Sequence, residues 1–128
     1  PDMREPVQYA IGYPSRLPLD NRKLDFSTLG SLTFQSPDRE RFPALDLAVE
    51  ALSKGGNMAC IMNAANESAV AAYLRDEIGF YDITDIVAEC MDGTDYVREC
   101  DLDTIFETDT ATHRRAAELA ARIASKKH

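Results

Sequence analysis

Basic residues are scarce in this chain of 128 residues, which has 14 Lys and Arg against 22 Asp and Glu and a formal net charge of −8. Nucleic acids and anionic membranes bind proteins through basic surfaces, so this composition argues against both partners. Long apolar runs are also lacking. Runs such as Met58 to Met62 are far shorter than the roughly 20 residues that a transmembrane helix needs. We therefore expect a protein that contacts neither nucleic acid nor membrane.

Cysteine is rare. Cys60, Cys90 and Cys100 are odd in number and widely spaced, which argues against a disulfide framework and favours a reducing, cytoplasmic compartment. A zinc site usually needs a close pair of ligands, and neither these cysteines nor His113 supplies one. We interpret the thiols as small hydrophobic side chains of the core, because a Cys–His nucleophile pair could be assembled only by the fold.

Recognisable catalytic motifs are absent as well. The six glycines are scattered, so no phosphate-binding loop is formed, and no Ser, His and Asp occur at a recognisable spacing. The acidic segment 80–109 does not match an EF-hand loop, because the position that requires glycine is Val97 or Phe106. Asp101 and Asp103 could act as general acid and base, but a solvated acidic surface is the better interpretation. The residues themselves predict no catalytic, cofactor-binding or metal-binding group.

What charge there is lies unevenly along the chain. Residues 80–109 hold ten acidic residues and one base, a net charge of −9, whereas residues 111–128 hold five bases and one acid, a net charge of +4. Opposite signs on successive segments suit two helices packed side by side, but two solvated faces are the favoured interpretation. Both interpretations stay open from the sequence.

The length allows one modest core, since 45% of the residues are hydrophobic. One domain, or one piece of a larger protein, is therefore expected. The sequence begins at Pro1, Met3 comes too late to be a start residue, and the first ten residues resemble neither a signal peptide nor a presequence. We expect a chain cut from a longer one.

Residues 1–41 are predicted to be a connector, because five of the six prolines lie at or before Pro37. Pro6 suits the first turn of a short helix that ends at Gly12. Leu32 and Phe34 alternate with polar residues over 31–35, which predicts one short β-strand. A strand of that length needs neighbours in a sheet, and the sequence offers no second one.

Residues 42–128 show the apolar period of helices, so the predicted fold is mainly α: an antiparallel four-helix bundle that follows the connector. The expected first or capping residues of the four helices are Pro43, Asn63, Asp82 and Asp109. The residues expected to face inward are Phe42, Leu45, Val49 and Leu52 in the first helix; Ala69, Val70, Tyr73, Leu74 and Ile78 in the second; Ile83, Ile86, Val87, Cys90 and Met91 in the third; and Ala116, Leu119, Ala120 and Ile123 in the fourth.

Three blocks of sequence are more specific than composition. They are Pro-Asp-Met-Arg at 1–4 with Pro6, Gln-Tyr-Ala at 8–10 and Tyr-Pro at 13–14; Leu-Gly-Ser-Leu-Thr-Phe at 29–34 with Pro37-Asp38 and Arg-Phe-Pro at 41–43; and Asn-Ala-Ala-Asn-Glu at 63–67 with Ala69-Val70. In order and spacing over roughly residues 1 to 90, they resemble the C-terminal third of the 1-deoxy-D-xylulose 5-phosphate reductoisomerase family. No generic helical bundle requires these three blocks in that order.

The resemblance implies an NADPH-dependent enzyme of non-mevalonate isoprenoid biosynthesis that uses Mg²⁺ or Mn²⁺ and forms a homodimer. It implies that residues 1–41 end the catalytic domain, that residues 42–128 form the C-terminal helical domain, and that the cofactor, metal and substrate ligands lie upstream of Pro1. Only Pro1 and Met3 are then expected to pack beside the substrate and nicotinamide pocket. This chain alone is expected to be inactive, with its own N-terminal and catalytic domains as partners. The alternative is an independent acidic helical module that binds a basic protein.

Overall fold

The computed structural model describes residues 2–21 and 23–126, and within these ranges every regular element is a helix. The predicted mainly α fold is therefore confirmed. The chain divides into two compact units, residues 1–36 and residues 37–128, which we call unit 1 and unit 2. No helix of the described ranges is both long and apolar enough to span a membrane.

Unit 1 contains two short helices, α1 (Arg4–Gly12) and α2 (Phe26–Leu29), neither of which has a buried residue. The helix predicted near Pro6 is thus present and begins two residues earlier, at Arg4. The Asp25 carboxylate caps α2 by accepting a hydrogen bond from the Ser27 amide at 2.9 Å. Unit 1 therefore consists of locally stabilised helices and irregular chain, without a hydrophobic core among its described residues.

The short strand predicted over residues 31–35 is wrong for the structure described here. Residues 30–38 are irregular, and Leu32 and Phe34 are 63% and 87% exposed. The physical reason is that a single strand needs a neighbouring strand to form hydrogen bonds with its backbone groups. The described ranges contain no such strand.

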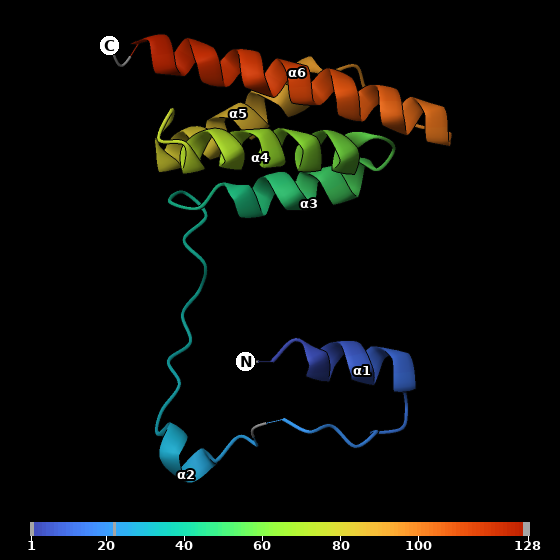
Figure 1. Cartoon of the computed structure of the whole chain (residues 1–128), viewed down its shortest axis with the longest axis vertical. Coiled ribbons are helices and arrows are strands. Elements are labelled where there is room, and N and C mark those ends of the chain that lie inside the picture. The colour runs from blue at the N-terminus through green and yellow to red at the C-terminus, as the bar shows by residue number, and fades with distance from the viewer. Residues whose placement is uncertain (1, 22, 127–128) are drawn as a thin grey trace. The chain divides into compact units, whose positions relative to one another are not determined.

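Unit 2 contains four helices: α3 (Ala44–Lys54), α4 (Met58–Leu74), α5 (Phe80–Gly93) and α6 (Leu102–Lys126). The chain turns back through short connections between them, and α4 lies between α3 and α6 (Figure 1). Helix α4 packs against all three of the others, and α5 also packs against α6. The arrangement is centred on α4, which is the most buried helix of the unit.

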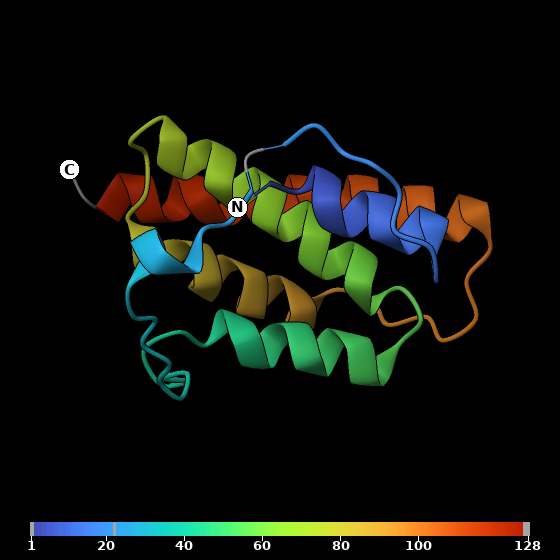
Figure 2. The same cartoon turned by 90° about the horizontal axis from the view of Figure 1, so that it is seen from below.

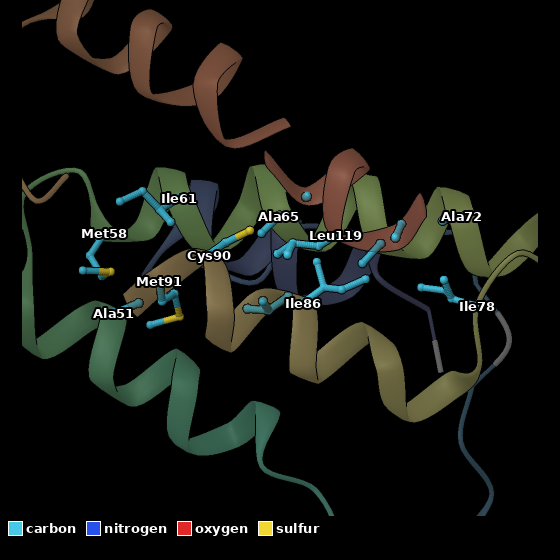
Figure 3. Close-up of a cluster of buried hydrophobic side chains, with 14 residues drawn as sticks. Ala51, Met58, Ile61, Ala65, Ala72, Ile78, Ile86, Cys90, Met91 and Leu119 are labelled. Atoms are coloured by element: carbon cyan, nitrogen blue, oxygen red, sulfur yellow. The ribbon is translucent and has the colours of Figure 1, made fainter. Parts of the chain in front are cut away.

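Small residues make the central position of α4 possible. Ala64, Ala65, Ala69 and Ala72 are 0–1% exposed, so neighbouring helices approach the α4 backbone closely. Ile86 of α5 and Leu119 of α6 supply larger side chains to the same layer (Figure 3). The inward residues predicted for α5 and α6 are confirmed, with Ile83 and Ile123 partly buried and the others buried: Ile86, Val87, Cys90, Met91, Ala116, Leu119 and Ala120.

Three predicted helix starts are wrong. Helix α5 begins at Phe80 after Gly79, so Asp82 lies in its first turn rather than before it. Helix α4 begins at Met58 rather than at Asn63, because residues 58–62 are apolar and two of them, Met58 and Ile61, join the core. Helix α6 begins at Leu102 rather than after Asp109, and Asp101 caps it by accepting a hydrogen bond from the Thr104 amide at 2.8 Å. Residues 102–105 are therefore the first turn of α6.

The predicted inner face of α3 is also wrong. Leu45, Val49 and Leu52 are 45%, 53% and 84% exposed, whereas Ala51 is buried and Leu47 is partly buried. The helix has apolar residues on two sides, and the sequence pattern favoured the side with more large residues. In the fold, the small side chain of Ala51 permits the closer contact with the core.

The side chain of Asn57 joins the turn between α3 and α4 to the connection 94–101 and to α6. It is 1% exposed, donates hydrogen bonds to the Asp95 carbonyl at 3.0 Å and to Thr108 Oγ1 at 3.1 Å, and accepts one from the Val97 amide at 2.9 Å. The connection 94–101 is thereby fixed against the turn between α3 and α4, at the same end of the unit (Figure 2).

Gly56 makes this close approach possible. Its φ angle is 57°, and a Cβ atom at this position would overlap the Val97 carbonyl oxygen. Gly55, its neighbour, has a φ angle of 67°, but a Cβ atom there would meet nothing within 4 Å. Both glycines permit a left-handed turn, and only Gly56 also leaves room for another segment.

We expect Asn57→Ala to lower the free energy of unfolding by roughly 2 to 4 kcal/mol, because three hydrogen bonds from this buried side chain to two segments, connection 94–101 and α6, are lost. Asn63→Ala is the matched control. Its side chain is exposed and bonds only Glu67, so the change should stay within about 0.5 kcal/mol. Urea unfolding followed by circular dichroism measures both, and equal losses would contradict the role assigned to Asn57.

The two adjacent glycines give a second comparison. Gly55→Ala should cost about 1 to 2 kcal/mol through its left-handed backbone alone. Gly56→Ala should cost at least about 1 kcal/mol more, because connection 94–101 must also move away. Thermal unfolding of the two variants tests this difference, and a Gly56 variant as stable as the Gly55 variant would show that the close approach is not required.

Candidate functional site

Met3, one of the two residues expected at a functional pocket, lies in a turn held by its neighbours. The Asp2 carboxylate accepts hydrogen bonds from the Arg4 amide at 3.0 Å and from the Arg4 guanidinium at 2.6 to 3.0 Å. The Arg4 side chain, followed by its backbone amide, lowers the pKa of Asp2 to about 2. Met3 itself is 74% exposed, so its thioether is available to a partner. Pro1 lies outside the described residues.

A hollow of about 710 Å³ lies in unit 1 beside this turn and is lined by Asp2, Glu5, Lys23, Leu24, Asp25, Thr28 and Leu29. Its acids already have structural partners. Asp2 binds Arg4, Glu5 accepts a hydrogen bond from Asn21, and Asp25 caps α2. The side chain of Ser27 is the main cause of the lowered pKa of Asp25. The lowered pKa values of Asp2 and Asp25 keep these two carboxylates ionised, so they offer no proton for acid catalysis.

The block Asn-Ala-Ala-Asn-Glu lies within α4 and contributes to a polar cluster that the sequence did not predict. Ser68 Oγ lies 2.7 Å from His113 Nδ1 on α6, and His113 Nε2 lies 3.8 Å from Glu67 and 3.6 Å from Asp109. Ser68 and His113 are 45 residues apart. No spacing in the sequence signals this contact, because it depends on the packing of α4 against α6.

Ser, His and Asp side chains are the components of a hydrolytic triad, but this cluster lacks the remaining requirements. Ser68 lies inside α4, where backbone amides are used by the helix and cannot bind an oxyanion. The two carboxylates are beyond hydrogen-bond distance from His113. The arrangement can bridge two helices, and it does not present an activated nucleophile.

The buried and partly buried cysteines do not present an activated nucleophile either. Cys90 is buried and Cys60 is partly buried, and desolvation is the main cause that raises the pKa of each thiol. Raised values keep the thiols protonated, and a protonated thiol is a poor nucleophile and metal ligand. Over residues 2–21 and 23–126, no group of three or more His, Cys, Asp or Glu side chains has the geometry to hold a metal ion.

The acidic segment is partly explained by local structure. Asp82 accepts a hydrogen bond from the Gly79 amide at 2.6 Å at the start of α5, and Asp101 caps α6. Glu89 of α5 lies 2.8 Å from Arg122 of α6, an exposed ion pair between the acidic segment and the basic tail. Helices α5 and α6 do pack together, while most acids of the segment remain exposed, so both interpretations of its charge apply in part.

Comparison with known proteins identifies what the chain resembles as a whole. The family model described as "DXP reductoisomerase C-terminal domain" matches residues 1–115. The chain is 47% identical over 119 residues to 1-deoxy-D-xylulose 5-phosphate reductoisomerase of Bacteroides fragilis and 49% identical over 119 residues to that of Porphyromonas gingivalis. Both matches cover 93% of this chain and 31% of the relative.

Solved structures give the same result for the fold. The Zymomonas mobilis reductoisomerase in complex with NADPH superimposes with a TM-score of 0.82 at 42% identity, covering 94% of this chain and 32% of that one. A DOX-P reductoisomerase in complex with magnesium gives a TM-score of 0.75 at 32% identity, covering 99% and 33%.

The likeness extends further along the chain than the three sequence blocks, which agree only to about residue 90, since the family match continues to residue 115. The chain spans about a third of the length of the relatives that it matches. With a family model over most of its residues and relatives almost half identical to it, the chain belongs to the DXP reductoisomerase C-terminal domain family.

Proposed function

We propose that this chain is the C-terminal support domain of an NADPH- and divalent-metal-dependent reductoisomerase. The enzyme converts 1-deoxy-D-xylulose 5-phosphate to 2-C-methyl-D-erythritol 4-phosphate in non-mevalonate isoprenoid biosynthesis. The observation that carries the proposal is the likeness to reductoisomerases over more than nine tenths of the chain at 42–49% identity. The magnesium or manganese and the NADPH bind to the part of the enzyme that precedes this domain.

A support role agrees with the chemistry of the described residues. The Asp25 carboxylate caps α2, burial raises the pKa of the Cys60 and Cys90 thiols, and the Ser68–His113 contact bridges two helices. In this proposal, residues 1–41 complete the catalytic domain and residues 42–128 form an antiparallel four-helix bundle that supports it. The chain alone is inactive, and the parent enzyme is a cytoplasmic homodimer.

Met3 and Pro1 are the two residues of this domain that we place beside the substrate and nicotinamide pocket. The Asp2–Arg4 contact fixes the turn, and the Met3 side chain projects from it with three quarters of its surface exposed. A flexible thioether adapts to a flat aromatic surface such as a nicotinamide ring. Met3 therefore packs against the cofactor and takes no part in proton transfer.

The independent interaction module is the alternative. It is supported by the net charge of −9 in residues 80–109, most of whose acids are exposed. That module would bind a basic protein, and the affinity would fall steeply as salt increases. Titration calorimetry of this chain with the preceding two thirds of the enzyme separates the two functions. A support domain binds that part of the enzyme through apolar packing, so its affinity is retained at high salt.

The main test is a domain replacement. The C-terminal third of the Bacteroides fragilis reductoisomerase is exchanged for this chain, and substrate-dependent NADPH oxidation is measured. We expect the 128-residue chain alone to give no turnover and the replacement enzyme to be active within about tenfold of the parent, because changes remote from the reacting atoms cost little. Turnover by the chain alone, or an inactive but folded replacement enzyme, would contradict the proposal.

A second test concerns the Met3 contact. In the replacement enzyme, Met3→Ala should raise the KM for NADPH by roughly three- to tenfold while kcat changes little, because part of one apolar side chain is lost from binding. Ile11→Ala is the matched control, since Ile11 lies on α1, the helix that directly follows Met3, and is 82% exposed. Equal effects of the two changes would show that Met3 has no special place at the cofactor.

A further inference from the structure

One side of α3 is an apolar surface that the described residues of unit 2 leave exposed. We call it the outer face of α3. It consists of Leu45, Val49 and Leu52 of the helix, which are 45%, 53% and 84% exposed, together with Phe42, which lies two residues before the helix and is 47% exposed. The spacing of four and three residues places Leu45, Val49 and Leu52 along one side of the helix.

The opposite side of α3 is already in use. Leu47 and Ala51 pack into the core with α4, which lies next to α3 in unit 2 (Figure 1). At 100° per residue, positions 45, 49 and 52 point away from positions 47 and 51. A helix that is apolar on two sides is usually covered on both, because leaving four large side chains in water forfeits their burial.

The charges beside the outer face are neutralised within the chain. Asp46 forms an ion pair with Arg39, and Glu50 forms one with Lys54 four residues later. The hydrogen bond from Lys54 to Glu50 is the main cause that raises the pKa of the ammonium group. The acids of α3 are thus satisfied without an external base, so the face suits an apolar partner rather than a basic one.

We propose that the outer face of α3 is the surface on which this domain docks against the part of the reductoisomerase that precedes it, through apolar side chains of that part. The inference rests on the proposed function. The chain spans 31–33% of its relatives and matches a C-terminal domain, so roughly two thirds of such an enzyme lies on the N-terminal side.

The position of α3 in the chain supports this occupant. Helix α3 is the first helix of unit 2, hence the one nearest in sequence to the preceding part. A covalent connection gives that part a high effective concentration at the face, which a separate copy of this chain lacks. Because α3 is fixed to α4 through Leu47 and Ala51, docking here orients the whole of unit 2.

Cysteine labelling tests the coverage directly. Val49→Cys places a thiol on the outer face, and Leu102→Cys, at the 67% exposed first residue of α6, is the matched control. Each variant is reacted with a maleimide in the 128-residue chain and in the replacement enzyme, and the labelled peptide is quantified by mass spectrometry so that native thiols do not interfere.

We expect both cysteines to react rapidly in the chain alone, and the cysteine at position 49 to react at least about tenfold more slowly in the replacement enzyme, since a covered site reacts only after opening. The cysteine at position 102 should keep its rate. Equal rates at position 49 in the two proteins, or equal slowing at both positions, would overturn the proposal. Protection in the chain alone that grows with its concentration would also overturn it, because a second copy would then be the occupant.

The activity of the wild-type replacement enzyme separates this inference from the proposed function. An active enzyme with a rapidly labelled position 49 overturns the docking surface alone. A folded but inactive enzyme overturns the proposed function, and the docking surface with it.

Discussion

The buried amide of Asn57 is the constraint on which the arrangement of unit 2 depends. A single side chain bonds the turn between α3 and α4, the connection 94–101 and Thr108 of α6. The Gly56 backbone admits the Val97 carbonyl at the same place. Helix α6 also has a part-buried polar contact with α4 at Ser68 and an exposed one with α5 at Glu89, and its apolar contacts are not directional. Hydrogen bonds with fixed geometry define its position.

Once α6 is fixed in this way, the alanines of α4 determine how closely the helices approach. Ala64, Ala65, Ala69 and Ala72 leave little side-chain volume on the faces that α4 shares with its neighbours. A polar contact between α4 and α6, Ser68 with His113, also bridges these two helices.

The sequence predicted those parts of the fold that depend on local pattern. The inward residues of α5 and the start of α3 after Pro43 are confirmed, because a helical period and a proline at a helix start act within a few residues. Asn63 and Asp109 have the chemistry of caps but lie inside helices, where neighbouring apolar residues prolong the helix past them. The Ser68–His113 contact and the three hydrogen bonds of Asn57 could not be predicted, since they join residues about 40 to 50 positions apart.

The error on α3 has a different origin, and it bears on function. Sequence periodicity correctly indicated that Phe42, Leu45, Val49 and Leu52 form one apolar face, yet the described fold leaves that face in water and buries Ala51 instead. Periodicity reports that a face is covered in the working protein without saying by which part of it. For a chain that spans a third of its relatives, an unpartnered apolar face is the expected sign of a contact with the remaining two thirds. The same residues that misled the prediction of the core therefore form the surface at which we propose that this domain joins its enzyme.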